Sequence, residues 1–407
     1  MDNYVPLHVH TELSLLDSCT NFKDYVNFCV DNGMKAICFT EHGNIYQHFA
    51  KRQYCKEKGI KYLHGCEVYL TSQLEPKIRD NYHTILIAKD MEGFKELNIL
   101  AGKAKSKDHI YYNPRLSFEE FFNISPHIFK ISACLKSPLA DKENIKPDIY
   151  DKLCRTYDYY EIQYHNDKNK SQYNYNQYLY ELSKKYNKPL VATGDSHSVS
   201  KYKAECRKIF LQAKRKDYDN EDDFDLVIKN YEDFKKAFYE QNALPNDVIL
   251  QAIENTNKIA DQCEEIIDDC SIKYPIVSDN DEEELKNLIN KKYEEKKQRG
   301  IISNDKRYLD NIREEFRVFK KVNMLGFMLG MAQISEWCEK NGIPRGFGRG
   351  SCCGSTIAYI TDIIDVDPVK WNTIFSRFCN EYRKEVRRYR FRFRSKRQRK
   401  SIQLHHG

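Results

Sequence analysis

Seven short runs of apolar, β-branched or aromatic residues recur through the first half of this chain, and stretches of helical length separate most of them. This alternation is typical of a parallel sheet or barrel wrapped by helices, because parallel strands need a crossover between them. The pattern therefore predicts an α/β fold. The predicted strands are Tyr4–His10, Ala36–Thr40, Lys61–Tyr69, Thr84–Ala88, Phe129–Ala133, Tyr159–Tyr164 and Pro189–Thr193. The predicted helices include Phe22–Asn32, Tyr46–Lys58, Met91–Lys105 and Ser171–Tyr186.

Most of these runs end in a residue that can bind a metal ion. His8 and His10 alternate along the first run, so both side chains face the same side. His83 differs, because it opens the fourth run instead of closing it. Since functional sites of α/β folds gather at the carboxyl ends of the strands, we expect these side chains to converge there. The candidates are His8, His10, Asp17, Glu41, His42, Glu67, His83, Cys134, His165, Asp195 and His197.

One histidine or aspartate at a strand end is more often a cap or a satisfied polar group than a ligand, but recurrence at most strand ends is hard to obtain from structural need alone. Imidazole, carboxylate and thiolate together suit Zn or Mn better than Ca, with Fe as a further candidate and Mg less suited. The number of ligands predicts two or three ions, which would bind a phosphate ester and activate water. Histidines outside the pattern, predicted to be surface or core residues, are His48, His64, His109 and His127.

The chain resembles the PHP (polymerase and histidinol phosphatase) domain of bacterial DNA polymerase III alpha subunits in the runs PLHVHTELSLLDS, FTEHGN, GIKYLHGCEVYL, HTILIAKD, ISACL and VATGDSH. This resemblance implies a PHP-type seven-stranded (β/α) barrel and a metal-dependent 3′ to 5′ exonuclease that proofreads. Glu41 stands where the family usually has Asp, outside the ligand set. The segments KAECRKIFLQAK and AIENTNKIADQC resemble the helices that close this domain. The implied ligands are His8, His10, Asp17, His42, Glu67, His83, Cys134, Asp195 and His197.

A glycine-rich loop, GFGRGSCCGS, occupies residues 346–355. Glycines let the backbone approach a phosphate closely, and exposed N–H groups, hydroxyls and an arginine can donate to its oxygens. More than fifty residues around the loop resemble the start of the α+β palm of the same polymerases, whose Gly-Ser loop holds the triphosphate of the incoming nucleotide. Cys352 and Cys353 replace small residues usual there. The implied nucleotide-binding residues are Gly348, Arg349, Gly350, Ser351 and Ser355.

The family pattern continues into an acidic motif, P-D-I-D-x-D, whose aspartates hold two Mg ions, but no Asp follows Asp367 in this chain. Residues 383–400 instead hold eleven basic residues and one acid. One choice of codons for residues 389–400, read in another frame together with the last two bases of the Arg388 codon, encodes D-I-D-F-D-F-D-Q-K-D-R-E, so a frameshift is our hypothesis for this tail. The alternative is a basic arm that contacts phosphates. Without paired carboxylates, this chain alone is not expected to polymerise DNA.

Four regions are therefore expected: a PHP phosphoesterase domain at 1–200, a helical extension at 201–275, a partial palm at 276–381 and a basic tail at 382–407. The leading interpretation is part of a DNA polymerase III alpha subunit. The alternatives are a free-standing PHP phosphoesterase for small phosphate esters and a catalytically silent truncated product. By resemblance, the partners are DNA primer-template, deoxynucleoside triphosphates, other replicase subunits and the sliding clamp.

Composition sets the expected compartment. The N-terminus lacks the ordered sections of a secretory signal, and no apolar run approaches the roughly 18 residues of a spanning helix, so a cytoplasmic protein without membrane contact is expected. The 14 cysteines are scattered without a C-x-x-C pair, which predicts reduced thiols. The net charge of +6 comes from the basic tail, so it is discounted as a sign of nucleic-acid binding.

Overall fold

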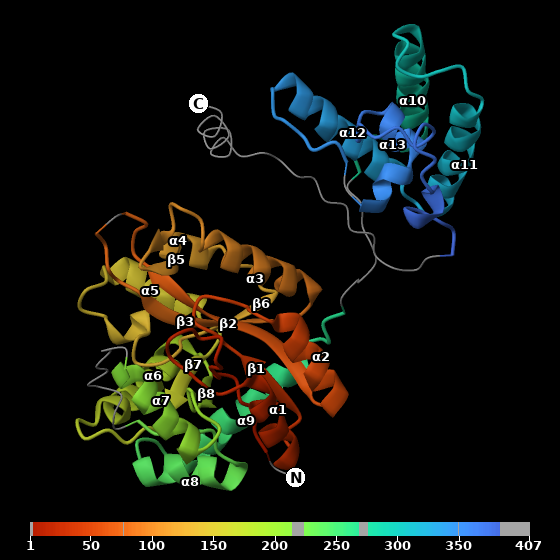
Figure 1. The fold of residues 1–407 in the computed structure, drawn as a ribbon. Helices are drawn as coiled ribbons and strands as arrows, with labels where there is room; N and C mark the ends of the chain where they lie inside the picture. The colour runs from red at the N-terminus through yellow and green to blue at the C-terminus, as the bar shows by residue number, and fades with distance from the viewer. Residues whose placement is uncertain (1–2, 76, 214–223, 268–275, 349, 383–407) are drawn as a thin grey trace. The chain divides into compact units, whose positions relative to one another are not determined.

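The computed structural model describes residues 3–75, 77–213, 224–267, 276–348 and 350–382. The chain divides into two compact units, unit 1 (Met1–Asp268) and unit 2 (Asp269–Gly407) (Figure 1). The nucleotide-loop candidate Arg349 and the basic tail from residue 383 lie outside the described residues. Every cysteine that the structure describes is a free thiol, as predicted. Within those same ranges, the helices contain no stretch long and apolar enough to cross a bilayer.

Unit 1 is built on a barrel whose strands follow the predicted order. The pairing of β1 with β2 is parallel, whereas β3 runs antiparallel to both of its neighbours, β2 and β6. A parallel bridge between Ile131 and Tyr159 joins β6 to β7, which pairs in parallel with β8. The six strands are β1 (Ala36–Phe39), β2 (Lys61–Thr71), β3 (Tyr82–Ala88), β6 (Ile128–Ile131), β7 (Tyr160–Gln163) and β8 (Leu190–Thr193).

The N-terminal segment 4–10 closes the barrel between β1 and β8. On one side, the Cys38 N–H donates to the Pro6 carbonyl at 2.9 Å. On the other, the Ser196 N–H donates to the His8 carbonyl at 3.0 Å, within a parallel bridge that pairs Val9 with Ser196. The segment thus takes the seventh strand position of the predicted barrel, although its only regular pairing is that bridge.

A hairpin of β4 (Ile110–Tyr111) and β5 (Asn113–Ser117) extends the sheet beside β2, with β5 parallel to β2. The sequence pattern did not predict it. The first strand is two residues long, and Pro114 in the second removes a backbone donor, so neither run shows an alternating apolar pattern.

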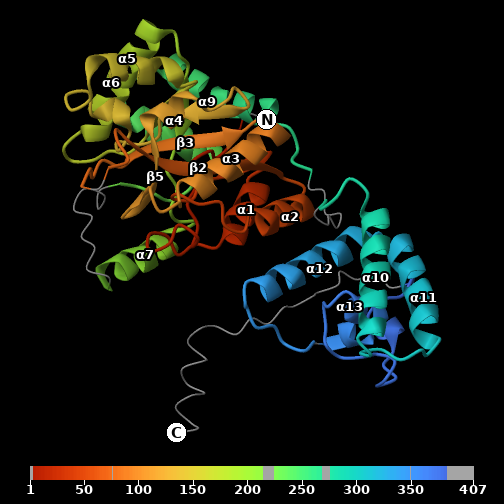
Figure 2. The ribbon, with the colours of Figure 1, turned by 90° about the horizontal axis from the view of Figure 1, so that it is seen from above.

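Helices surround this barrel, and the four that the sequence predicted are found within two residues of their expected bounds. Helix α9 ties the closing strands together, because Thr256 accepts a hydrogen bond from the Val5 N–H at 2.9 Å and Asn255 donates to the Leu190 carbonyl at 2.7 Å. Figure 2 shows α1 and α2 side by side. The helices are α1 (Phe22–Asp31), α2 (His48–Lys58), α3 (Met91–Lys103), α4 (Phe118–Phe122), α5 (Pro147–Thr156), α6 (Ser171–Tyr186), α7 (Lys201–Ala213), α8 (Tyr231–Gln241) and α9 (Asn246–Gln262).

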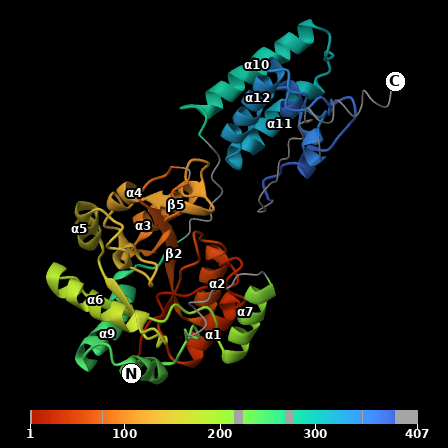
Figure 3. The ribbon, with the colours of Figure 1, turned by 90° about the vertical axis from the view of Figure 1, so that its left-hand side faces the viewer.

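Unit 2 has a hydrophobic core of its own, centred on buried residues such as Phe319, Met328, Ile357 and Ile364. Where the sequence predicts an α+β palm, the described residues of this unit form helices and contain no named strand (Figure 3). Helices α10 and α11 each pack against α12 and α13. The elements are α10 (Asp281–Gln298), α11 (Arg307–Lys321), α12 (Leu325–Lys340), the 3-10 turn η2 (Gly350–Gly354), α13 (Thr356–Ile360) and the 3-10 turn η3 (Phe375–Arg377).

Candidate metal centre

One edge of the barrel gathers the nine predicted ligands. The parallel strands finish at this edge, and β3 starts there because it runs antiparallel to its neighbours. His83 pairs with Tyr69 near the start of β3, so it reaches the same edge as Glu67 on β2. The one candidate that opens its strand therefore joins those that close theirs, which the sequence alone could not explain.

Six of the nine form three overlapping groups whose ligand atoms lie within 4.8 Å of one another. Glu67 is shared by two of these groups, and its carboxylate is 1% exposed. Its Oε1 lies 2.7 Å from His83 Nδ1, and its Oε2 contacts His42 Nδ1. The groups are His10 with His42 and His197, His8 with His10 and Glu67, and His42 with Glu67 and His83.

Asp195 joins the cluster from the loop after β8. Its Oδ1 lies 3.1 Å from His8 Nε2, 3.4 Å from His10 Nε2 and 3.5 Å from His197 Nδ1. Gly194 precedes it, and a Cβ there would lie 2.8 Å from the Tyr164 hydroxyl, so the glycine permits the close approach.

Asp17 joins from the loop after the first strand. Its Oδ2 lies 2.8 Å from His42 Nε2 and 3.0 Å from His197 Nε2. Arg207 on α7 donates from Nε to the Asp17 carbonyl at 2.7 Å and also pairs with the carboxylate. The helical extension thus supports a residue of the cluster directly.

Cys134 lies at the margin of the cluster. Its Sγ is 3.6 Å from His83 Nδ1, and burial raises the pKa of the thiol well above its usual value. It belongs to none of the three groups found among the described residues.

The backbone is strained where it delivers these side chains. Leu16, Ala133 and Asp195 have positive φ angles of 73°, 61° and 45°. Leu16 and Ala133 directly precede Asp17 and Cys134 in the chain. Left-handed backbone at residues other than glycine is uncommon and clusters at functional sites.

The charges of the cluster are strongly coupled. Burial favours the neutral acid, but neighbouring imidazoles hold the pKa of Glu67 well below its usual range. Burial also opposes a charge on His42, yet Glu67 and Asp17 raise the pKa of His42 to about 10. Burial and two nearby imidazoles lower the pKa of His10 to about 3, so this ring stays neutral and can offer a lone pair.

The cluster also leaves buried polar atoms in need of a partner. Glu67 Oε1 and Asp195 Oδ1 are buried and make no hydrogen bond of good geometry to any residue that the structure describes. Two imidazole nitrogens, His8 Nε2 and His10 Nε2, face each other at 3.0 Å beside these oxygens. Imidazole nitrogens and carboxylate oxygens that converge in one buried space fit divalent cations of the Zn or Mn type.

The histidines that the sequence set apart lie in other surroundings. His64 bonds Asn98, His109 bonds Glu120, and His127 bonds Asp90, while His48 packs edge-on against His64. His165, two residues after β7, is buried and stacks on Phe224 with 4.8 Å between ring centroids. Its ring nitrogens bond no residue in the described part of the chain.

Two supporting residues escaped the sequence analysis. Glu161 on β7 is fully buried, and its Oε1 accepts from His8 Nδ1 at 2.7 Å. Ser14 is equally buried and lies 2.8 Å from His10 Nδ1. A buried acid inside an apolar strand was a visible signal for Glu161, whereas nothing in the sequence marked Ser14.

In unit 2, the glycine loop contains Gly348 and Gly350, whose backbone is left-handed with φ angles of 140° and 69°. Ser351 is exposed, but Ser355 is fully buried. Ser355 donates to Glu315 Oε2 at 2.7 Å and accepts from the Ala358 N–H at 3.1 Å, so its hydroxyl caps α13. Burial raises the pKa of Glu315 to about 7.

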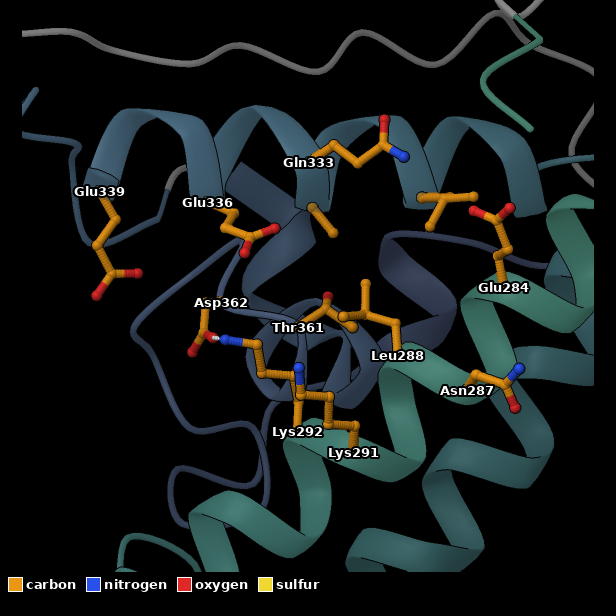
Figure 4. Close-up of a pocket in the computed structure, with 12 residues that line it drawn as sticks. Glu284, Asn287, Leu288, Lys291, Lys292, Gln333, Glu336, Glu339, Thr361 and Asp362 are labelled. Carbon is orange, nitrogen blue, oxygen red and sulfur yellow. Dashed lines mark ion pairs between the residues drawn. The ribbon is translucent and has the colours of Figure 1, made fainter. Parts of the chain in front are cut away.

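A cavity of about 340 Å³ lies between α10 and α12 of unit 2 (Figure 4). Leu288, Leu329 and Ala332 give it an apolar lining, and charged residues surround it. Asp362 at its margin pairs with Lys292 at 2.8 Å and with Lys296 at 2.7 Å. Asp362 is thus paired within the unit.

Comparison with known proteins finds a different family model in each unit. Residues 6–168 match the PHP domain, and residues 283–406 match the bacterial DNA polymerase III alpha NTPase domain. DNA polymerase III subunit alpha of Aquifex aeolicus is 30% identical over 94% of this chain and 35% of its own length, and that of Borreliella burgdorferi is 30% identical over 93% and 34%. The chain thus spans about a third of the length of these curated relatives. A solved histidinol phosphate phosphatase of Lactococcus lactis aligns with 52% of this chain and 93% of its own, at 13% identity and a TM-score of 0.26.

Proposed function

Because the chain carries a PHP domain and is homologous over most of its length to bacterial DNA polymerase III alpha subunits, we propose that unit 1 is a metal-dependent phosphoesterase whose substrate is the 3′ end of DNA. The nine residues of the cluster would hold two or three divalent ions, with Zn or Mn as the first candidates and Fe as a further one. In the family context, this activity would remove a misincorporated nucleotide.

One observation carries the proposal: side chains from five strand positions of the barrel meet at one edge, where Glu67 Oε1 and Asp195 Oδ1 are buried without a hydrogen bond of good geometry to a described residue. The three overlapping groups share Glu67, His10 and His42, which suits ions that lie close together and share ligands. Neighbouring ions are the arrangement used for in-line displacement at phosphorus.

The chain's own groups have separable tasks in this chemistry. Divalent ions supply the Lewis acidity that polarises the phosphoryl group and makes water nucleophilic at neutral pH. Glu67 lies between two ligand groups and would hold their spacing. Asp17 is kept in place by Arg207, and Asp195 is set at the end of β8 by its left-handed backbone. The lowered pKa of His10 keeps its ring neutral, so one of its nitrogens carries a lone pair.

The test is hydrolysis by the full chain loaded with Zn or Mn. Two substrates are compared, a single-stranded DNA with a labelled 3′ end and a small phosphomonoester. We expect shortening of the DNA from its 3′ end, loss of activity with a chelator, and recovery on adding metal. Hydrolysis of the small ester alone would replace this proposal with the free-standing phosphoesterase, and no hydrolysis of either would favour a catalytically silent chain.

For unit 2, we propose that the glycine loop binds the triphosphate of a deoxynucleotide through Gly348, Gly350, Ser351 and the adjoining Arg349. Ser355 would support the loop without contacting the triphosphate, because its hydroxyl already bonds Glu315 and the N-terminus of α13. Template-directed synthesis with Mg, and contacts with primer-template, other replicase subunits and a sliding clamp, are proposals for a protein of the relatives' full length. Both tryptophans lie in unit 2, so a titration with a Mg-nucleotide followed by tryptophan fluorescence tests the loop.

The finer division of the chain is likewise proposed: a PHP domain at 1–200, its helical extension at 201–275, a partial palm at 276–381 and a basic tail at 382–407. Limited proteolysis of the full chain, with the fragments identified by mass, would locate the accessible boundaries.

A further inference from the structure

Behind the cluster lies a buried ion pair that touches none of the imidazole nitrogens. Glu41 directly follows the Thr40 that ends the predicted strand at β1, and it is 1% exposed. Its Oε1 accepts from Lys51 Nζ and from Thr11 Oγ1, both at 2.6 Å. Its Oε2 accepts from Ser14 Oγ at 2.6 Å and from the Thr11 N–H at 3.1 Å. Every partner of this carboxylate is a donor, as an ionised carboxylate requires.

These contacts fix the direction of the Ser14 hydroxyl. A serine hydroxyl has one proton to donate and two lone pairs to accept with. The proton of Ser14 points to Glu41, and one lone pair accepts from the His42 N–H at 3.2 Å. Only an accepting position remains for His10 Nδ1, which lies at 2.8 Å. His10 must therefore donate from Nδ1.

A neutral imidazole that carries its proton on Nδ1 has a bare Nε2. In His10 that atom lies 3.0 Å from His8 Nε2, 3.4 Å from Asp195 Oδ1 and 3.7 Å from Glu67 Oε2. The other tautomer would direct a proton into this space and block a metal ion. The tautomer of His10 thus decides whether it can be a ligand at all.

We propose that Lys51, Glu41 and Ser14 are positioning residues that hold His10 in the metal-binding tautomer before any metal arrives, an inference that rests on the metal centre proposed above. The tautomer of the neighbouring His8 is held by a single hydrogen bond, since Nδ1 of His8 donates directly to Glu161. Outer partners of this kind fix ring orientation and typically change metal affinity 10- to 100-fold when removed.

Lys51, Glu41 and Ser14 form a chain of hydrogen bonds to His10, here called the Lys51 relay. Lys51 determines which way the protons in this chain point. It is 2% exposed and has only protons to offer, so the oxygen it contacts must be an acceptor. In Glu41→Gln, the charged Lys51 would hold the amide oxygen, so the amide NH₂ would take the place of Oε2 beside Ser14 and the Thr11 N–H would lose its acceptor. Ser14 would then accept from that NH₂ and turn its own proton toward His10 Nδ1. One near-isosteric substitution should thereby move the proton of His10 from Nδ1 to Nε2.

The experiment measures tautomers in the metal-free full chain, by ¹H–¹⁵N spectra of ¹⁵N-histidine-labelled protein, with the His10 signal assigned from a His10→Gln variant. Wild type should show a bare Nε2, and Glu41→Gln a bare Nδ1. Zinc affinity, from competition with a chelator, should fall at least about tenfold. An unchanged tautomer in folded Glu41→Gln would overturn the proposal.

Ser14→Ala is the second variant, in case Glu41→Gln does not fold. It removes the acceptor for His10 Nδ1, so both tautomers should be populated, and retention of a single Nδ1–H form would count against the relay. Ser18→Ala is the matched control: Ser18 lies in the same loop and is also buried, but donates to the His197 carbonyl at 2.8 Å. It should leave the His10 tautomer unchanged. Absence of zinc binding by the wild type would refute the proposed metal centre while leaving the tautomer result intact.

Discussion

Replacing Lys51 with Met should destabilise unit 1 and leave unit 2 unaffected. The change leaves the Glu41 carboxylate buried without its cation, and breaking a buried ion pair in this way costs about 3 to 5 kcal/mol. The lowered pKa of Glu41 gives a second value for this free energy. Burial alone would raise the pKa of Glu41, but Lys51 and the surrounding donors lower it from 4.5 to about 2. At about 1.4 kcal/mol per pKa unit, this is a stabilisation of about 3 kcal/mol.

The sign of the pH dependence follows from that lowered pKa. Because the folded protein releases the Glu41 proton more readily than the unfolded chain, the stabilisation is present above about pH 4.5 and is lost as the pH falls toward 2. In Lys51→Met, most of this acid-sensitive contribution should be missing already at neutral pH.

The assay is urea unfolding of the full chain at neutral pH, followed by two signals. Trp337 and Trp371 both lie in unit 2, so tryptophan fluorescence reports the unfolding of that unit. Circular dichroism reports both units, and the part of its change that does not coincide with the fluorescence change reports unit 1. Lys95→Met is the control, because Lys95 pairs with Glu92 at 2.8 Å on the exposed surface. Such pairs contribute about 1 kcal/mol or less. A loss below about 1 kcal/mol in Lys51→Met, or an equal shift of the fluorescence transition, would refute the reasoning.

Three further outcomes are expected. The double variant His8→Ala, His10→Ala should lose bound metal, measured by elemental analysis, and phosphodiester hydrolysis, whereas His127→Ala, on an exposed histidine far from the cluster in its contacts, should keep both. The stability of unit 2, followed by tryptophan fluorescence, should fall as the pH rises from about 4.5 to about 7, because folded Glu315 keeps a proton that the unfolded chain releases; Glu315→Gln should flatten this slope, and a slope unchanged from wild type would exclude the assignment. Gly194→Ala should destabilise unit 1 in urea by about 1 to 3 kcal/mol through overpacking, and wild-type stability would show that the neighbouring tyrosine can move aside.

The α/β class and the positions of the barrel strands could be predicted because each of those strands lies in a mainly apolar run, which can be recognised without knowing its neighbours in space. The direction of each strand could not be predicted in this way. The residues around β3 have the same apolar composition as those of the parallel strands, so composition did not indicate that β3 is antiparallel. Only the position of His83 reflected the antiparallel direction of β3, because His83 is a candidate ligand at the start of its strand and not at the end.

The ligand candidates could be predicted for a similar reason, since they recur at strand ends, but the residues that orient them could not. Ser14 and Lys51 act through the direction of a proton and the filling of a buried space, and both depend on contacts between segments far apart in sequence. Ser355 shows the converse. A serine in a glycine loop suggests a phosphate ligand, while the fold commits its hydroxyl to Glu315 and a helix end.

The cluster exists only when the barrel is closed, because its members come from strand ends spread between His8 and His197. Closure depends on segment 4–10, which bonds β1 on one side and the chain after β8 on the other. That same segment carries His8 and His10. A metal that binds only the closed barrel stabilises it, by about 2.7 kcal/mol at a hundredfold excess over its Kd. Metal binding and barrel closure are therefore one linked equilibrium, and the Lys51 relay lies inside it: by presetting His10, it removes part of the ordering that the ion would otherwise have to impose.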